Sequence, residues 1–140
     1  MRLFLRLTAL AFVLLLSGCE SDDEQQLKVL DLTTTNLVGT WKLSETYVSP
    51  GGETSWQPVE DGSSYTFTQE GTFTSDNNEN CAEGEYTVDD DNLALTYTCE
   101  ELEEGQADVW NLAVHSLTEE VLILRGVGCV EACLYKYKKI

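Results

Sequence analysis

Side chains that could carry out acid–base or nucleophilic chemistry are few in this sequence. His115 is the single histidine, and no serine stands in a glycine-rich elbow where a base could activate it. Glu45 and Asp108 share the strand parity of Trp41 and Trp110, so both carboxylates would face inward, and two carboxylates can serve glycoside hydrolysis. Near strand ends, however, carboxylates more often line a wet opening. We therefore expect a protein that is not an enzyme.

Metal-binding patterns are incomplete. Residues 76–80 begin like a calcium loop, with oxygen ligands at alternate positions, but Cys81 stands where an EF-hand has glycine and Thr87 where it has glutamate. Weak calcium binding by this loop or by residues 89–91 stays open. The single histidine argues against histidine-rich zinc sites. The sequence predicts no cofactor and no metal.

The first 18 residues are typical of a signal peptide. Arg2 and Arg6 precede an apolar run at residues 7–16, which is too short to span a bilayer because spanning needs about 20 residues. The run ends in Leu16-Ser17-Gly18-Cys19, which resembles the lipobox of bacterial lipoproteins. The resemblance implies that Cys19 is acylated and becomes the mature N-terminus. Ordinary cleavage beside a chance cysteine is the alternative.

Residues 19–36 form a tether in this interpretation. Residues 20–26 are acidic and polar without a core residue, which predicts a solvated leader. They resemble the acidic export tract of surface lipoproteins, which implies a lipid-anchored protein on the outer membrane that faces outward. A periplasm-facing domain is the alternative. Residues 27–36 carry spaced leucines that suit a short helical turn or coil closing one end of a barrel.

The net charge limits the possible partners. The chain has a formal net charge of −17, and loss of Arg2 and Arg6 with the signal peptide would make it more acidic still. Such a surface repels phosphate backbones and anionic headgroups, so no nucleic-acid partner is expected. Divalent cations or basic partners remain compatible with it.

Residues 37–140 predict a single all-β domain. Apolar residues alternate with polar ones over eight short runs separated by Gly, Asp and Asn, a pattern of half-buried strands. The runs are residues 40–48, 64–69, 72–75, 85–88, 93–99, 107–114, 121–125 and 133–139. Eight consecutive antiparallel strands lose their exposed edges by closing, so we expect an up-and-down β-barrel with room for side chains or one small ligand.

The cysteines fit this arrangement. Apart from Cys19, four of the five cysteines remain, and two disulfides are expected in an exported protein. Matching Val88 with Leu93 places Cys99 opposite Ala82, one residue out of register with Cys81. A β-bulge at Gly84 would correct the offset and favour a Cys81–Cys99 bridge. Cys129 and Cys133 would then close the last loop, although the crossed pairings remain possible.

The chain resembles the lipocalin-like domain of bacterial lipoproteins. Gly39-Thr40-Trp41 matches the lipocalin GxW motif, and Tyr65-Thr66-Phe67, Glu70-Gly71-Thr72-Phe73, Gly84-Glu85-Tyr86 and Ser116-Leu117-Thr118 follow in the same order. The resemblance implies a ligand-binding barrel and an arginine packed against the tryptophan, for which Arg125 is the candidate. The 104 residues from Leu37 to Ile140 are few for a lipocalin cup.

Two functions follow from this interpretation. In the first, the barrel binds a small apolar or amphipathic ligand, with a carboxylate or a tyrosine hydroxyl orienting its polar end. The expected ligand-binding residues are Trp41, Glu45, Tyr65, Phe67, Tyr86, Tyr97, Asp108 and Trp110. In the second, the barrel is filled and contacts another cell-envelope component. Trp56, in the first long loop, would contact a ligand or partner, or fold back as a plug.

Overall fold

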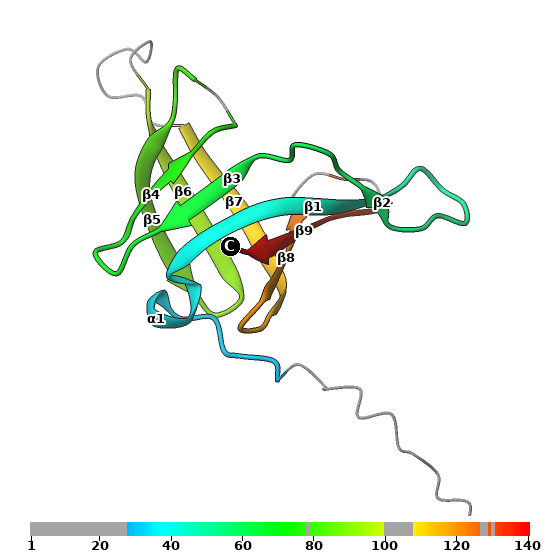
Figure 1. Cartoon of the computed structure of the whole chain (residues 1–140), viewed down its shortest axis with the longest axis horizontal. Helices are drawn as coiled ribbons and strands as arrows, with labels where there is room; N and C mark the ends of the chain where they lie inside the picture. Colours follow the sequence, from blue (N-terminus) through cyan, green and yellow to red (C-terminus); the bar gives the residue numbers. More distant parts are fainter. Residues whose placement is uncertain (1–27, 78, 100–107, 127–128, 130) are drawn as a thin grey trace, which may run out of the picture.

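A computed structural model describes residues 28–140 except residues 78, 100–107, 127–128 and 130 (Figure 1). The expected signal peptide, Cys19 and the acidic leader therefore lie outside the described residues. Within the described part, no helix has the length and apolarity needed to cross a bilayer.

The described residues form nine antiparallel strands, eight of which close into a barrel. The strands are β1 (Gly39–Ser49), β2 (Gln57–Pro58), β3 (Ser64–Phe67), β4 (Thr72–Ser75), β5 (Glu83–Asp89), β6 (Asn92–Thr98), β7 (Asp108–Leu117), β8 (Val121–Gly126) and β9 (Ala132–Lys139). Consecutive strands from β3 to β9 are neighbours, and β1 pairs with both β3 and β9 to complete the ring (Figure 1). The expected all-β, eight-stranded, up-and-down barrel is confirmed, and the two-residue β2 is an addition.

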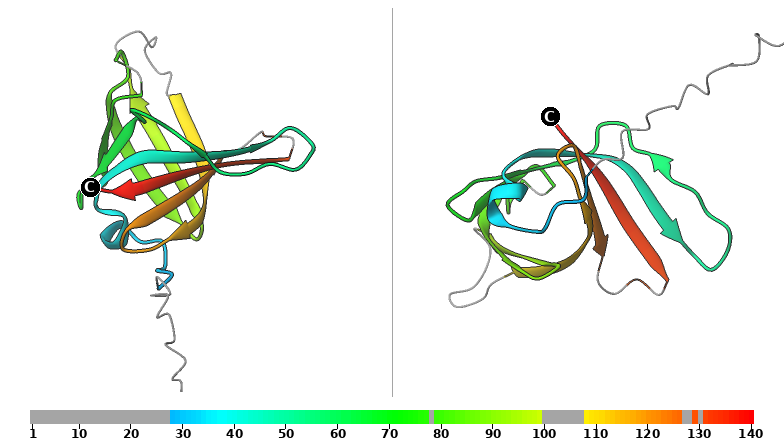
Figure 2. Two further views of the ribbon diagram at one scale, coloured as in Figure 1. Left: turned by 45° about the vertical axis from the view of Figure 1, so that its right-hand side comes forward. Right: turned by 90° about the horizontal axis from the view of Figure 1, so that it is seen from below.

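Strand β1 extends beyond the closed ring of the barrel. Its first residues, from Gly39 to Lys42, pair with β3, whereas Glu45 and Thr46 pair with β2. The second half of β1 also pairs with the start of β9, so the two strands extend past the ring as an arm (Figure 2). We define the arm as residues 45–49, 56–58 and 132–136.

One end of the barrel is closed by the segment before β1. The short helix α1 (Thr34–Leu37) is capped by the Thr33 side chain, which accepts a hydrogen bond from the backbone N–H of Asn36. Leu37 is fully buried, and its carbonyl accepts a 2.8 Å hydrogen bond from the Trp41 indole Nε1. The Leu30 N–H donates to the Leu117 carbonyl at 2.8 Å, which ties the segment to β7. For residues 27–36 the prediction was a short helical turn or coil that closes one end of the barrel, and the structure shows the helical turn at residues 34–37.

The cation packed against Trp41 is Lys139, and the prediction of Arg125 is wrong. The Lys139 Nζ lies 4.9 Å from the centroid of the Trp41 ring. A Cβ at Gly39, where φ is +133°, would lie 2.4 Å from the Lys139 Cε, so the glycine leaves the space through which the lysine stem passes. In β8 the side chains of Leu122 and Leu124 point inward, so that of Arg125 points outward and is exposed. Arg125 pairs with Leu134, far from the closed end where Trp41 lies.

The expected inward face is confirmed over most of the barrel. The buried side chains alternate along the strands and fill the closed half with aromatic rings and leucines. They are Leu37, Trp41, Tyr65, Phe67, Phe73, Tyr86, Leu93, Leu95, Tyr97, Leu117, Leu122, Leu124 and Tyr137. Phe67 and Tyr86 meet edge to face with ring centroids 5.0 Å apart, as do Phe73 and Tyr97 at 4.9 Å.

Both expected disulfides are present, but the mechanism proposed for the first is wrong. Cys81 bonds to Cys99, and Cys129 bonds to Cys133. Pairing of β5 with β6 is continuous through Gly84, without a bulge, and Val88 lies opposite Leu93 as expected. The bridge is reached diagonally because the paired residues end at Glu83 and the chain bends at Cys81. Gly84 is required for another reason: a Cβ there would lie 2.1 Å from the Thr96 carbonyl oxygen.

Candidate ligand pocket

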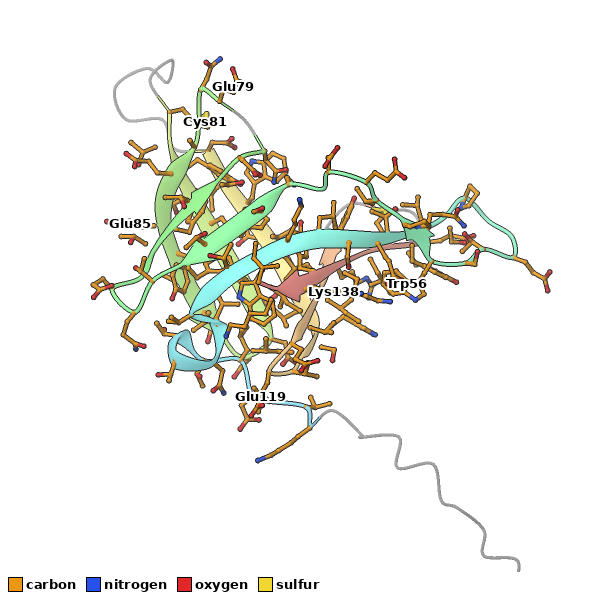
Figure 3. All side chains as sticks on the ribbon, viewed as in Figure 1. Trp56, Glu79, Cys81, Glu85, Glu119 and Lys138 are labelled. Carbon is orange, nitrogen blue, oxygen red and sulfur yellow. A yellow bond between two sulfur atoms is a disulfide. The ribbon has the colours of Figure 1, made fainter. Side chains whose placement is uncertain are left out.

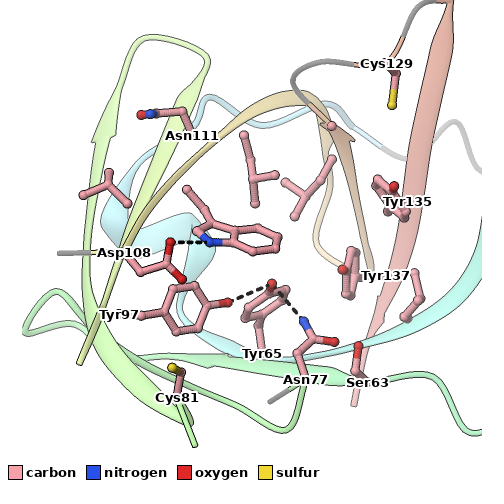
Figure 4. A pocket seen from close by; sticks show the side chains of 16 residues that line it. Ser63, Tyr65, Asn77, Cys81, Tyr97, Asp108, Asn111, Cys129, Tyr135 and Tyr137 are labelled. Atoms are coloured by element: carbon pink, nitrogen blue, oxygen red, sulfur yellow. Dashed lines mark hydrogen bonds between the residues drawn. The ribbon is translucent and has the colours of Figure 1, made fainter. Parts of the chain in front are cut away.

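The end of the barrel opposite α1 holds a pocket of about 860 Å³ (Figure 4). Strands β1, β3, β6, β7, β8 and β9 contribute to its wall, together with residues of the loops that follow β4 and β8. Cys81 and Cys129 line the pocket, so each disulfide joins a loop of the mouth to a neighbouring segment. Figure 3 places Cys81 at this end and Glu119 at the closed end.

Tyrosine hydroxyls form a hydrogen-bond chain across the pocket wall. The Tyr65 and Tyr97 hydroxyl oxygens lie 3.2 Å apart, and the Asn77 Nδ2 donates to the Tyr65 hydroxyl at 3.0 Å (Figure 4). Tyr137 contacts Tyr65 with ring centroids 5.7 Å apart and continues the aromatic wall onto β9. The wall therefore presents neutral hydroxyl and amide groups on an aromatic surface.

Asp108 and Trp110 stand together on β7 at the mouth. The Asp108 Oδ1 accepts a 2.8 Å hydrogen bond from the Trp110 Nε1, and the Trp110 ring lies 6.1 Å from that of Tyr97 (Figure 4). Trp110 faces the pocket as its parity predicts, but it remains 53% exposed because it lies near the start of β7 at the open end. It is a rim residue, whereas the sequence placed it in the interior.

Four of the eight expected ligand-binding residues line the pocket, namely Tyr65, Tyr97, Asp108 and Trp110. Trp41, Phe67 and Tyr86 face inward but lie in the filled half of the barrel. The Tyr86 hydroxyl donates to the Thr68 carbonyl at 2.6 Å, at the turn between β3 and β4. These three side chains form the floor beneath the pocket, and the structure does not bring them into its lining.

Glu45 lies outside the barrel, contrary to its expected inward position. A β-bulge between Leu43 and Glu45 shifts the alternation, so that Leu43 pairs with inward-facing Tyr137 and Glu45 pairs with Lys136. The Glu45 Oε2 and the Lys136 Nζ form a 2.7 Å ion pair on the arm. Glu45 and Asp108 are therefore on different faces of the sheet, and they do not form a carboxylate pair across one cavity.

Trp56 lies on the arm and does not line the pocket (Figure 3). Its ring is half-buried against Tyr47, with centroids 5.6 Å apart, and the Lys136 Nζ lies 4.2 Å from its centroid. The ring packs on the outer face of the sheet, so Trp56 does not plug the barrel, and its contact with a partner stays a prediction.

Several lining residues were missed by the sequence interpretation, including Asn77, Tyr135 and Tyr137. The two tyrosines alternate with Lys136 and Lys138 in the last expected strand, so their parity was a usable signal. Asn77 stands in the loop that was weighed as a calcium site. Its contact with Tyr65 depends on the fold of that loop, which alternation does not describe.

Burial affects the ionisation of the tyrosines. Desolvation raises the pKa of Tyr97 and of Tyr137 well above the ordinary value of 10.0, and the hydrogen bond with Tyr65 adds to the rise for Tyr97. Both phenols therefore stay protonated in the folded protein.

His115 lies exposed on β7 at a second bulge, away from the pocket lining.

The raised pKa values predict a loss of stability at alkaline pH. Above pH 10.0 the unfolded chain releases phenol protons that the folded chain retains, so the free energy of unfolding falls as pH rises. Each such tyrosine contributes a slope of at most about 1.4 kcal/mol per pH unit. Tyr137→Phe should reduce this slope in urea titrations between neutral and alkaline pH, and an unchanged slope would contradict the prediction.

Comparison with known proteins identifies the family. The model of the lipocalin-like domain matches residues 37–124, which is more than half of the chain. The chain belongs to the lipocalin-like domain family. No curated protein and no solved structure matches it.

The match begins at the segment that carries Gly39 and Trp41 and ends within β8. The last strand of this lipocalin-like domain lies beyond it, although β9 closes the barrel and supplies Tyr135 and Tyr137 to the pocket. A lipocalin-like barrel suggests ligand binding in general, and β9 gives this pocket part of its aromatic wall.

Proposed function

We propose that this protein is a lipid-anchored, non-catalytic binding protein of the bacterial outer membrane, whose lipocalin-like barrel holds a small apolar or amphipathic ligand. The pocket at the open end carries the proposal. Its volume of about 860 Å³ lies within the range of small-molecule sites, and its wall combines aromatic rings with a few polar groups. Because side chains fill the half of the barrel beneath the pocket, a ligand would enter and leave through the mouth and would not pass through the barrel.

Burial of apolar ligand surface would supply most of the binding free energy, at about 25 cal/mol per Å². Leu112 and Leu124 offer aliphatic contacts, and Tyr65 and Tyr97 offer hydroxyls that can orient a polar group. The preformed Tyr65–Tyr97 hydrogen bond supports a rigid wall, which lowers the cost of ordering the site.

A fluorescent apolar probe tests ligand binding. N-phenyl-1-naphthylamine should bind the protein of residues 20–140, which contains the whole described barrel, with one site. Trp110→Ala and Tyr97→Ala should each weaken binding by about tenfold, because a truncated aromatic contact costs roughly 1–2 kcal/mol. Trp56→Ala removes an aromatic ring from the arm and should leave binding unchanged. Probe binding that is equal in all variants, or absent from the protein, would contradict a ligand site in the pocket.

The membrane anchor rests on Leu16-Ser17-Gly18-Cys19 and on the acidic residues that follow. Acyl chains contribute about 0.8 kcal/mol per buried methylene, so an acylated Cys19 would hold the protein on a membrane effectively permanently. Cys19→Ala should move the protein from the membrane pellet to the soluble fraction of cells, whereas Ser21→Ala should not. Retention of the Cys19→Ala variant in the pellet would contradict lipidation at this residue. Residues 20–26 favour the outward-facing orientation over the periplasmic one.

A second function, contact with another cell-envelope protein, has support from the arm. The arm projects past the barrel (Figure 2), and Val48 on it is 50% exposed. Tyr47, Trp56 and Lys136 form a packed patch on the same segment. Failure of every apolar probe to bind would favour this second function over the first.

A further inference from the structure

The charge of the described pocket lining is negative only. Among the described residues that line it, Asp108 is the one charged side chain. Its Oδ1 accepts the Trp110 indole N–H, and in the described part of the chain no lysine or arginine forms an ion pair with it. The ion pair that the described residues do form, Glu45 with Lys136, lies on the arm. A carboxylate at a pocket mouth without a cationic partner favours a ligand that brings the positive charge.

The aromatic groups around Asp108 suit an organic cation. Trp110 stands beside the carboxylate at the rim, with Tyr97 next to it at 6.1 Å between ring centroids. Indole and phenol faces attract ammonium groups through the ring quadrupole. Tyr135 and Tyr137 extend the same surface across the pocket (Figure 4). The aromatic rings of the wall would therefore attract a cationic ligand in addition to the Asp108 carboxylate.

A bare metal ion does not fit this site. Calcium takes six to eight oxygen ligands, and magnesium needs a near-octahedral set. The described lining of the pocket offers one carboxylate, and within the described residues no group of three or more His, Cys, Asp or Glu side chains is arranged to hold a metal. A small inorganic cation would also leave the apolar wall unused. The arrangement instead matches a molecule with a charged end and an apolar body.

We infer that the pocket binds an amphipathic organic cation, such as an alkyl ammonium or amidinium compound, with its charged group between Asp108 and Trp110 and its apolar body against Leu112 and Leu124. This inference rests on the proposed ligand-binding function and narrows its ligand class. The formal net charge of −17 raises the local concentration of cations near the mouth and speeds their arrival.

Three probes with one alkyl chain test the inference. Octyltrimethylammonium, 1-octanol and octanoate are titrated calorimetrically into the protein of residues 20–140. The ammonium compound should bind about tenfold more tightly than the alcohol, from its carboxylate and aromatic contacts. Octanoate should bind most weakly. In Asp108→Asn the ratio of ammonium to alcohol affinity should fall well below its value in the unaltered protein, because the aromatic rings alone would then favour the ammonium group. The amide oxygen of the new side chain can still accept the Trp110 N–H.

A matched variant separates the local charge from the overall charge. Asp90→Asn makes the same charge change in the turn between β5 and β6, at the closed end, where φ of +49° suits asparagine. It should keep the full preference for the ammonium compound. Equal loss of the preference in Asp90→Asn and Asp108→Asn would overturn the inference, as would equal binding of ammonium and alcohol by the unaltered protein. In those cases the proposed ligand-binding function would stand, whereas no binding of any probe would overturn both.

Discussion

Replacing Trp41 with alanine is expected to lower the free energy of unfolding by about 3–5 kcal/mol, the usual range for a fully buried large aromatic side chain. Trp41 has 0% exposure, its Nε1 donates to the Leu37 carbonyl at 2.8 Å, and Lys139 covers its ring. The substitution would therefore remove the hydrogen bond between α1 and β1 and leave a cavity at the closed end. Urea denaturation followed by circular dichroism measures the loss.

Two further variants divide this loss into its parts. Trp41→Phe keeps a ring but leaves the buried Leu37 carbonyl without its indole donor, and we expect it to cost about 1–3 kcal/mol. Lys139→Met keeps an apolar stem over Gly39 and removes the charge, and it should cost about 0.5–2 kcal/mol. A Trp41→Ala protein whose free energy of unfolding stays within about 1 kcal/mol of the unaltered value would contradict the assignment of Trp41 as the closing residue of the core.

Removing the Cys81–Cys99 disulfide is the second substitution with a large expected effect. The bridge joins residues separated by 18 positions, and loss of such a cross-link costs about 3 kcal/mol from the larger entropy of the unfolded chain. Cys81 also lines the pocket, so the double variant Cys81→Ser and Cys99→Ser should loosen the mouth and weaken N-phenyl-1-naphthylamine binding. Thermal and urea unfolding measure the stability, and the probe titration measures the binding.

The second disulfide supplies the matched comparison. Cys129 and Cys133 are separated by 4 positions, so their cross-link constrains the unfolded chain less, and its removal should cost about 2 kcal/mol. The two double variants make the same chemical change at the same end of the barrel. If removal of the shorter bridge costs more than removal of the longer one, loop closure is not the main source of the stabilisation.

Much of the barrel could be predicted from alternation. Side chains in a strand point to opposite faces with a period of two, so Tyr65, Phe67 and Tyr97 were placed inward by parity alone. The tight turns between strands set the register, which is why Val88 was matched with Leu93. The Cys81–Cys99 pair was also predicted, but through a bulge at Gly84 that the structure does not have. These features involve consecutive strands joined by short loops. The pairing of such strands depends on residues that are close together in the sequence.

Parity failed where one extra residue interrupted a strand. The bulge after Leu43 turned Glu45 outward to Lys136, and no residue type in that segment signals it. The choice of Lys139 over Arg125 against Trp41 was also beyond the sequence, because it depends on which end of the barrel each strand position reaches.

The strand pattern and most of the inward residues of this protein are readable from its sequence, because both follow from local alternation and short connections. The division of the interior is not, because it depends on how the closed barrel stacks residues that are distant in the chain. Trp41, Phe67 and Tyr86 fill one half, while Tyr65, Tyr97 and Trp110 line an open pocket in the other. All six share one parity, and their height along the barrel, set by closure of β1 on β9, separates floor from pocket.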